Sequence, residues 1–276
     1  MSAANPNIGA DEMLGFAALT PTYGYGPLRA LLFDVDGTLA ETERDGHRIA
    51  FNRAFRDCGL RWDWDAKRYG ELLQITGGRE RIAHYAALHD PRWLAGDDAA
   101  SAIAELHARK NLHYADLVRR GRIQLRHGLH EWLQQARTAG LHLGIVTTTS
   151  RDNLEALLDS SFDADMRAAF GVRITGEDVR LKKPDPECYR LALAALGLQP
   201  SQALAIEDSR NGLRSAMAAE VPTLIVRSHY FRDDDFSGAW RVIDDFRECS
   251  LADVQRRFDA TQLDETACPH RAVPIL

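Results

Sequence analysis

The sequence predicts an α/β protein: a doubly wound, Rossmann-like parallel sheet, with a small helical domain inserted after its first strand. Three observations indicate this fold. Unbroken apolar runs recur along the chain, helical patterns separate them, and the long interval 35–140 contains helical patterns without a good buried strand.

Buried strands are predicted where apolar residues follow one another without interruption, as is typical of parallel strands covered on both faces. A weaker candidate is Val172–Ile174, which contains an arginine. The strong candidates are residues 30–33, 141–146, 203–206 and 223–226.

One helix has clear boundary signals. Asp185 is predicted as its N-cap, Pro186 as its first helical residue, and Gly197 ends it after Leu196. Helices of this kind between buried strands are what a doubly wound sheet requires.

The interval 35–140 is too long for one crossover, which needs only about a dozen residues. Its helical patterns lie at roughly 45–58, 65–73, 79–89, 98–119 and 128–139. We therefore expect a helical cap. The predicted organisation is an N-terminal extension at 1–28, a core at 29–42 and 123–249, a cap at 43–122, and a C-terminal extension at 250–276.

Composition narrows the possible functions. The 276 residues carry a formal net charge of −6, which argues against a general nucleic-acid binder. We see no apolar stretch long enough for a membrane span and no signal peptide, and we expect a soluble monomer. The cysteines are far apart, which favours reduced thiols in the cytoplasm. They are Cys58, Cys188, Cys249 and Cys268.

A pair of carboxylates follows the first buried run. Asp34 and Asp36 are two residues apart, so in an extended segment both face one side. Two adjacent carboxylates require a cation, for which Mg²⁺ is the natural choice. One carboxylate can attack phosphorus, and the other can transfer protons. The alternative is a simple turn, because Asp and Gly37 are common turn formers.

Other polar groups follow later strands. Lys183 can supply positive charge for phosphoryl transfer, and Thr147 and Thr148 can donate to phosphate oxygens. Asp208 suits a metal, whereas Glu207 could bind the metal, orient the site or hold Lys183. Each residue also has a non-functional interpretation: Lys183 could be a solvated lysine, the threonines could be ordinary strand-end residues, and Asp208 could be a helix N-cap. They lie at or just beyond the carboxyl ends of predicted strands or, for Lys183, just before a helix, and this joint placement favours one site.

These segments resemble the four motifs of the haloacid dehalogenase superfamily. They are Asp34–Thr38, Thr147–Ser150, Lys183–Pro184 and Glu207–Ser209. The resemblance implies a phosphatase in which Asp34 is the nucleophile and Asp36 the general acid/base. It also implies a Mg²⁺ site formed by Asp34, the backbone carbonyl of Asp36, and Asp208, with Glu207 a further candidate ligand. Thr147, Thr148 and Lys183 would then hold the transferring phosphate.

The cap and its flanks contain further matching segments, at residues 41–43, 47–52, 69–82, 106–110 and 147–153. By these segments the chain resembles the CbbY-type group more closely, over about residues 29–247. That group includes xylulose-1,5-bisphosphate phosphatases, so the resemblance implies a phosphorylated sugar as partner and a link to the Calvin cycle. Arg79 departs from it, because lysine is frequent there. Candidate substrate-binding residues are Glu43, Gly77, Gly78, Arg79, Glu80, Arg81, His107, Arg109, Lys110, Thr147, Thr148, Thr149, Ser150 and Asn153.

Several alternatives stay open at this point. Phosphoglycolate phosphatases and β-phosphoglucomutase-like phosphomutases are expected to share the same motifs. A non-catalytic sugar-phosphate sensor is a more distant possibility. Without the resemblance, each charged cap residue could equally belong to a solvated helix face. We also expect Lys182 to be a solvated lysine.

Overall fold

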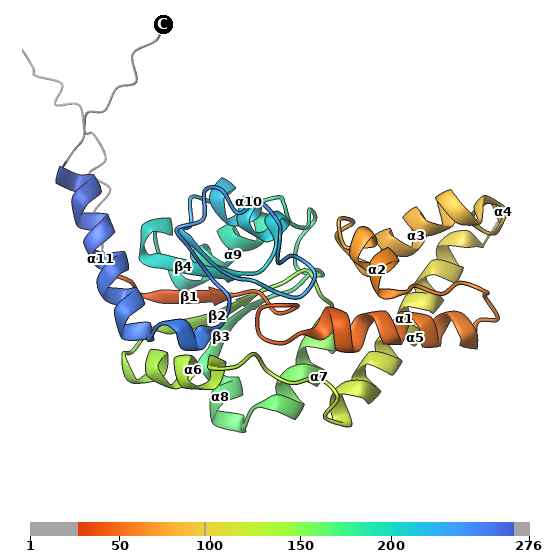
Figure 1. The fold of residues 1–276 in the computed structure, drawn as a ribbon, viewed down its shortest axis with the longest axis horizontal. Coiled ribbons are helices and arrows are strands. Elements are labelled where there is room, and N and C mark those ends of the chain that lie inside the picture. The colour runs from red at the N-terminus through yellow and green to blue at the C-terminus, as the bar shows by residue number, and fades with distance from the viewer. Residues whose placement is uncertain (1–26, 97, 268–276) are drawn as a thin grey trace, which may run out of the picture.

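The computed structural model describes residues 27–96 and 98–267, so nearly all of the predicted N-terminal extension lies outside the described residues. Six parallel strands form one sheet in the order β3-β2-β1-β4-β5-β6 (Figure 1). The predicted fold class is confirmed. The strands are β1 (Ala30–Phe33), β2 (His142–Val146), β3 (Phe170–Ile174), β4 (Ala203–Glu207), β5 (Thr223–Val226) and β6 (Arg241–Ile243).

Strand β1 lies at the centre of the sheet, and all four of its residues are buried. Phe33 pairs with Ile145 of β2 on one side and with Ile206 of β4 on the other. Because the three strands are parallel and in register, the residues that follow them emerge at one edge of the sheet.

The two faces of the sheet bury different side chains. Leu31 and Phe33 point into the larger apolar cluster, whereas Ala30 and Leu32 point into the opposite one. The first cluster includes residues of α6 (Leu129–Thr138), α7 (Arg151–Ser161), α8 (Ala164–Ala169) and α11 (Leu251–Ala267). The second includes residues of α9 (Glu187–Leu196) and α10 (Arg210–Ala218).

Between β1 and β2, the helices that precede α6 extend beside the sheet, whereas α6 packs on it (Figure 1). We call the first six the cap helices: the π-helix η1 (Glu43–His47), α1 (Arg48–Asp57), α2 (Ala66–Leu72), α3 (Gly78–His89), α4 (Pro91–Leu94) and α5 (Ala99–Arg119). They share an aromatic core of their own that includes Phe51, Phe55, Trp64 and Tyr69. The boundaries proposed for a cap domain remain a prediction.

The C-terminal segment differs from its prediction as an extension. Leu251, Val254 and Phe258 of α11 are buried in the same cluster as β1. The N–H of Leu28 also donates to Asp259 Oδ1 (2.9 Å). Apolar residues at helical spacing give this segment a face that packs on the sheet, so residues 251–259 belong to the core.

The start of α9 is one residue later than predicted. Pro186 is the N-cap, and the Asp185 carboxylate accepts the N–H of Glu187 (2.9 Å). Gly197 ends the helix in the left-handed conformation, as predicted. Short 3₁₀ turns occur at Pro200–Gln202 and Phe246–Glu248. Within the described ranges, none of the helices combines the length and apolarity needed to cross a membrane.

Candidate active site

Asp34 follows the central strand directly. Its N–H donates to the Ile206 carbonyl of β4 (2.9 Å), which fixes the residue at the carboxyl edge of the sheet. Gly37 then turns the chain with a φ of +87°, and a Cβ atom there would lie 1.9 Å from Asp208 Oδ2. The glycine therefore permits both the turn and the close approach of a second strand-end carboxylate.

Lys183 connects three groups at this edge. Its Nζ donates to Asp34 Oδ1 (2.7 Å), to Glu207 Oε1 (2.6 Å) and to the Val146 carbonyl (2.7 Å). All three ammonium hydrogens are thereby used. Burial lowers the pKa of Lys183, but the charges of Asp34 and Glu207 outweigh burial and raise it above its usual value. Lys183 is therefore a fixed positive charge in contact with the predicted nucleophile.

Glu207 holds Lys183 in place by accepting a hydrogen bond from its ammonium group. Its Oε1 also accepts the Tyr189 hydroxyl (2.6 Å), and the residue is fully buried. Of the roles predicted for Glu207, this geometry supports the one in which it holds Lys183.

A group of carboxylates could accept a cation. Ligand atoms of Asp34, Glu207 and Asp208 lie within 4.8 Å of one another. Asp208 Oδ2 is buried and has no hydrogen-bond partner among the described residues. Burial raises the pKa of Asp34 to about 8, and burial and Asp34 raise that of Asp208 well above its ordinary value. Glu207 Oε2 is likewise buried without a partner among the described residues, and an all-oxygen donor set with unpaired atoms fits a hard divalent cation.

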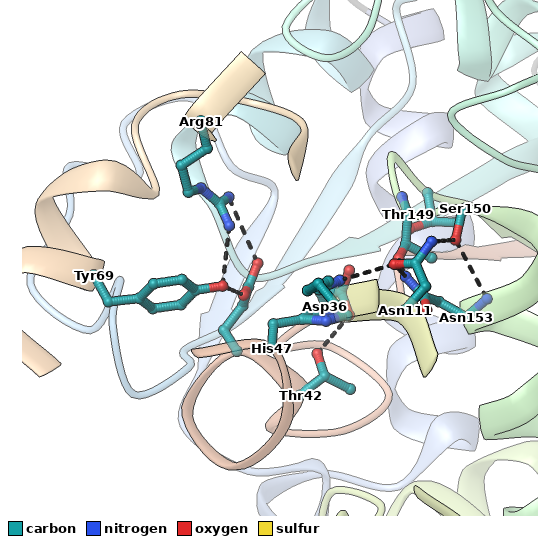
Figure 2. A network of polar contacts seen from close by, with 12 residues as sticks. Asp36, Thr42, His47, Tyr69, Arg81, Asn111, Thr149, Ser150 and Asn153 are labelled. Carbon is teal, nitrogen blue, oxygen red and sulfur yellow. Dashed lines mark hydrogen bonds and ion pairs between the residues drawn. The ribbon is translucent and has the colours of Figure 1, made fainter. Parts of the chain in front are cut away.

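Asp36 has two partners on a single oxygen (Figure 2). The Thr42 hydroxyl donates to Oδ1 (2.5 Å), and His47 Nε2 lies 3.0 Å from the same atom. Burial raises the pKa of Asp36, but His47 and Thr42 outweigh burial and hold it at about 2. His47, which stacks on Tyr114, is absent from the predicted site residues because its contact depends on the π-helical turn before α1.

A cavity of about 810 Å³ lies between the cap helices and the strand ends. A smaller one of about 70 Å³ adjoins it, lined among others by Asp34, Asp36, Thr148, Lys183 and Asp208. The predicted residues that line the larger cavity are Asp36, Glu43, Gly77, Gly78, Arg79, Glu80, Arg81, His107, Lys110, Thr148, Thr149, Ser150 and Asn153.

On the cap side, Arg81 is held by its neighbours. It donates to the Tyr69 hydroxyl (3.0 Å), and Tyr69 donates to Glu43 (Figure 2). Arg81 also donates to the Leu72 carbonyl (3.2 Å). The guanidinium is thus positioned before any ligand is present, which reduces the entropy lost on binding.

Lys110 brings a second cation into the same cavity. Its ammonium lies 5.2 Å from the centre of the Phe51 ring and 5.3 Å from that of Tyr114. Burial lowers the pKa of Lys110 to about 8. Burial and Lys110 together lower the pKa of His107 to about 3, so this histidine is neutral.

A polar network joins cap helix α5 to the core helix α7 (Figure 2). Asn153 donates to Asn111 Oδ1 (3.1 Å), and Asn111 donates to Ser150 Oγ (3.5 Å). Ser150 also caps α7 by accepting the N–H of Asn153. Asn111 was not among the predicted residues, since a single asparagine on a helix carries no signal in the sequence.

Besides Glu207, two predicted residues line neither cavity. Arg109 is on α5 beside Lys110, but its guanidinium pairs with Glu105 (2.7 Å) on the exposed side of that helix. One residue along a helix rotates a side chain by about 100°, so the two neighbours cannot both face the cavity. Thr147 is buried, and its hydroxyl accepts the N–H of Thr149 (3.2 Å). Its side chain therefore shapes the strand end.

Lys182 also differs from its prediction. It lines the larger cavity and donates to Glu80 Oε1 (2.5 Å) on the cap. The expectation of a solvated lysine was wrong, because only the structure brings the cap within its reach.

Comparisons with known proteins identify the family of this chain. A model of the haloacid dehalogenase-like hydrolases matches residues 28–220. The chain is 44% identical to the protein CbbY of Cereibacter sphaeroides over 221 residues, 80% of this chain and 94% of that one. It is 32% identical to a phosphoglycolate phosphatase of Yersinia pseudotuberculosis over 199 residues, 71% of this chain and 80% of that one.

Solved structures of CbbY are similar to this chain as well. CbbY from Rhodobacter sphaeroides in complex with phosphate superposes with a TM-score of 0.75 at 44% identity, covering 82% of this chain and 98% of that one. A mutant of that protein in complex with xylulose 1,5-bisphosphate matches with the same TM-score and coverage at 43% identity. The chain belongs to the haloacid dehalogenase-like hydrolase family. The predictions of a CbbY-like chain and of a phosphatase are confirmed.

Proposed function

We propose that this enzyme is a Mg²⁺-dependent sugar-bisphosphate phosphatase acting through phosphorylated Asp34, with xylulose 1,5-bisphosphate as its substrate. The observation that carries the proposal is that cationic side chains occur at two separate places in the adjoining cavities. Lys183 stands at the Asp34 end, and Arg81 and Lys110 stand on the cap side. The xylulose 1,5-bisphosphate complex of the 43% identical CbbY mutant supports the choice of substrate.

In this proposal the two phosphates of the substrate have separate positions. The reacting phosphate lies at Asp34, where Lys183 and Thr148 stabilise its oxygens. The other phosphate lies against Arg81 and Lys110, with Arg79 at the cavity wall. An arginine fork held by Tyr69 suits a phosphate better than a freely rotating cation does.

The reaction then needs two displacements. A carboxylate oxygen of Asp34 attacks phosphorus, and the bond from phosphorus to the sugar oxygen breaks. The negative charge of the bound phosphate raises the pKa of Asp36 from about 2, so that Asp36 takes up a proton from solvent and gives it to that sugar oxygen. In the second displacement Asp36 takes a proton from water. The water oxygen attacks phosphorus, and the bond to Asp34 breaks. Asp36 ends protonated, Asp34 is free again, and inorganic phosphate leaves.

Mg²⁺ would be held by Asp34, Asp208 and the backbone carbonyl of Asp36, with Glu207 behind them holding Lys183. When bound, it would neutralise charge on the transferring phosphoryl group as a Lewis acid. The unpaired Asp208 Oδ2 supports this assignment.

We further propose that the enzyme acts as a monomer in the cytoplasm and takes part in the Calvin cycle. Its described cysteines, Cys58, Cys188 and Cys249, are unpaired thiols, as expected in a reducing compartment.

Phosphoglycolate is the second candidate substrate, because phosphoglycolate phosphatases share 32% identity with the chain. The test is phosphate release from xylulose 1,5-bisphosphate, phosphoglycolate and glucose 1-phosphate with Mg²⁺. We expect the bisphosphate to have the highest kcat/KM, and any other ranking contradicts the assignment. Conversion of glucose 1-phosphate to glucose 6-phosphate would instead indicate a mutase.

The Asp34→Asn variant tests the nucleophile. It should stay folded and bind the bisphosphate, yet release no phosphate and form no acid-stable phosphoprotein. A wild-type chain that binds the bisphosphate without any turnover would point to a sensor rather than an enzyme.

A further inference from the structure

The segment at residues 76–80, which comprises the end of the loop after α2 and the first turn of α3, contacts two separate segments of the core. Lys182 Nζ donates to Glu80 Oε1 (2.5 Å), and Asn211 Nδ2 donates to Thr76 Oγ1 (3.2 Å). Lys182 directly precedes Lys183, and Asn211 lies in the first turn of α10, just after Asp208. This segment is therefore held by residues close in sequence to the candidate catalytic groups.

The ion pair closes over the backbone of Gly77. A Cβ atom at that position would lie 2.2 Å from Glu80 Oε2 and 2.7 Å from Lys182 Nζ. Gly77 also has a φ of +99°, which a glycine adopts readily. The sequence thus leaves space at Gly77 for Glu80 and Lys182 to meet across the boundary between cap and core.

The pair is charged and partly exposed. Partial burial raises the pKa of Glu80, but the hydrogen bond from Lys182 outweighs it and lowers the pKa below 4.5. The Lys182 and Glu80 side chains are 27% and 47% exposed, so dissolved salt screens their attraction. Such a pair shifts an equilibrium by about twofold to fivefold.

We propose that Lys182 and Glu80 form a salt-sensitive latch that holds segment 76–80, which includes Arg79, and the adjacent Arg81 over the cavity. Lys182 is then a positioning residue. Through the backbone it links closure of the cap to Lys183, whose ammonium contacts Asp34. The Thr76–Asn211 bond is the neutral second attachment, which salt leaves intact. The effect of the latch on turnover rests on the proposed function, whereas its effect on the cap does not.

Amide hydrogen exchange of the full chain measures the latch without any substrate. The variants are Lys182→Glu, Glu80→Lys and the double reversal. We expect each single reversal to raise exchange at residues 76–81 by about twofold to fivefold. The double reversal restores the pair with its signs exchanged and should return exchange to near the wild-type rate.

Two controls accompany these variants. Reversal of Arg167 and Asp159, an exposed ion pair on α7 and α8 that lines neither cavity, should leave exchange at 76–81 unchanged. Increasing salt from 0.05 to about 1 M should bring the wild type toward the single reversals. Asn211→Ala should raise exchange equally at low and high salt.

Single reversals that leave exchange at 76–81 unchanged, or a double reversal no better than either single one, would overturn the latch. With the bisphosphate, we expect KM to rise in the single variants more than kcat falls, and to recover in the double variant. If exchange follows the expected pattern while even the wild type releases no phosphate, the latch stands and the proposed function fails.

Discussion

His47 Nε2 lies 3.0 Å from Asp36 Oδ1, the same oxygen that accepts the Thr42 hydroxyl. Two partners on one carboxylate oxygen fix the orientation of a side chain that has to transfer protons. Because His47 ends the π-helical turn and Thr42 precedes it, the first cap segment positions the predicted general acid/base.

Removing His47 should therefore reduce turnover more than binding. A hydrogen bond to a charged group contributes about 1.5–3 kcal/mol, so we expect His47→Ala to lower kcat by about tenfold to a hundredfold. KM should change much less. Steady-state phosphate release measures both, with Thr42→Val as the matched removal of the second partner. A kcat within twofold of wild type would show that Asp36 does not depend on His47.

Lys110 should make catalysis sensitive to alkaline pH. Burial lowers its pKa to about 8, so the side chain is charged below that pH and becomes neutral above it. Since the charged form attracts the distal phosphate, kcat/KM should fall by up to about tenfold between pH 8 and 9. Lys110→Arg keeps its charge over this range and should remove the fall. If the Lys110→Arg variant still shows the fall in kcat/KM, a group other than Lys110 causes it.

Asp208 should determine metal affinity. Calorimetric titration with Mg²⁺ should show binding to the wild-type chain and at least about tenfold weaker binding to Asp208→Asn. Asp235→Asn, an exposed position outside both cavities, is the matched control and should bind as the wild type does. Equal affinity in both variants would place the cation elsewhere.

The C-terminal helix should contribute to stability as a part of the core. Phe258 is fully buried beside the ring of Trp240, so Phe258→Ala should lower the free energy of unfolding by about 3–5 kcal/mol. Arg257→Ala, on the exposed side of α11, should change it by less than about 0.5 kcal/mol. Urea unfolding measures both. Equal effects would mean that α11 contributes little to the core.

The sequence predicted the parts of the fold that depend on local pattern. The apolar runs located β1, β2, β4 and β5 because buried parallel strands need such runs. Strand β6 was missed because its three residues at the sheet edge begin with Arg241 and form no apolar run. The packing of α11 was missed as well, since its apolar positions are interrupted by many charged ones.

Sequence analysis predicted the core residues of the site better than the cap residues, because the core residues belong to motifs beside predicted strands and helix starts. Asp34 and Asp208 directly follow β1 and β4, Lys183 lies in the segment between β3 and α9, and the structure brings the three together. Arg109 shows why cap residues were harder to predict from the sequence. A helix presents Lys110 to the cavity and turns its neighbour outward, and this choice depends on how the helix packs. The contact of Lys182 with Glu80 likewise depends on two segments that only the tertiary structure places together.

The order of strands has a consequence for biosynthesis. Ala30 pairs with His142 on one side and with Ala203 on the other. Both partner strands are synthesised after β1, so β1 can pair only when they have emerged. On the ribosome, Asp34 emerges long before Lys183 and Asp208. A nascent chain that stops short of Lys183 therefore holds Asp34 and Asp36 without the lysine that neutralises them. A chain that stops short of β4 also lacks Asp208 and one of the two strands that pair with β1, so we expect activity only after β4 has been synthesised and has paired with β1.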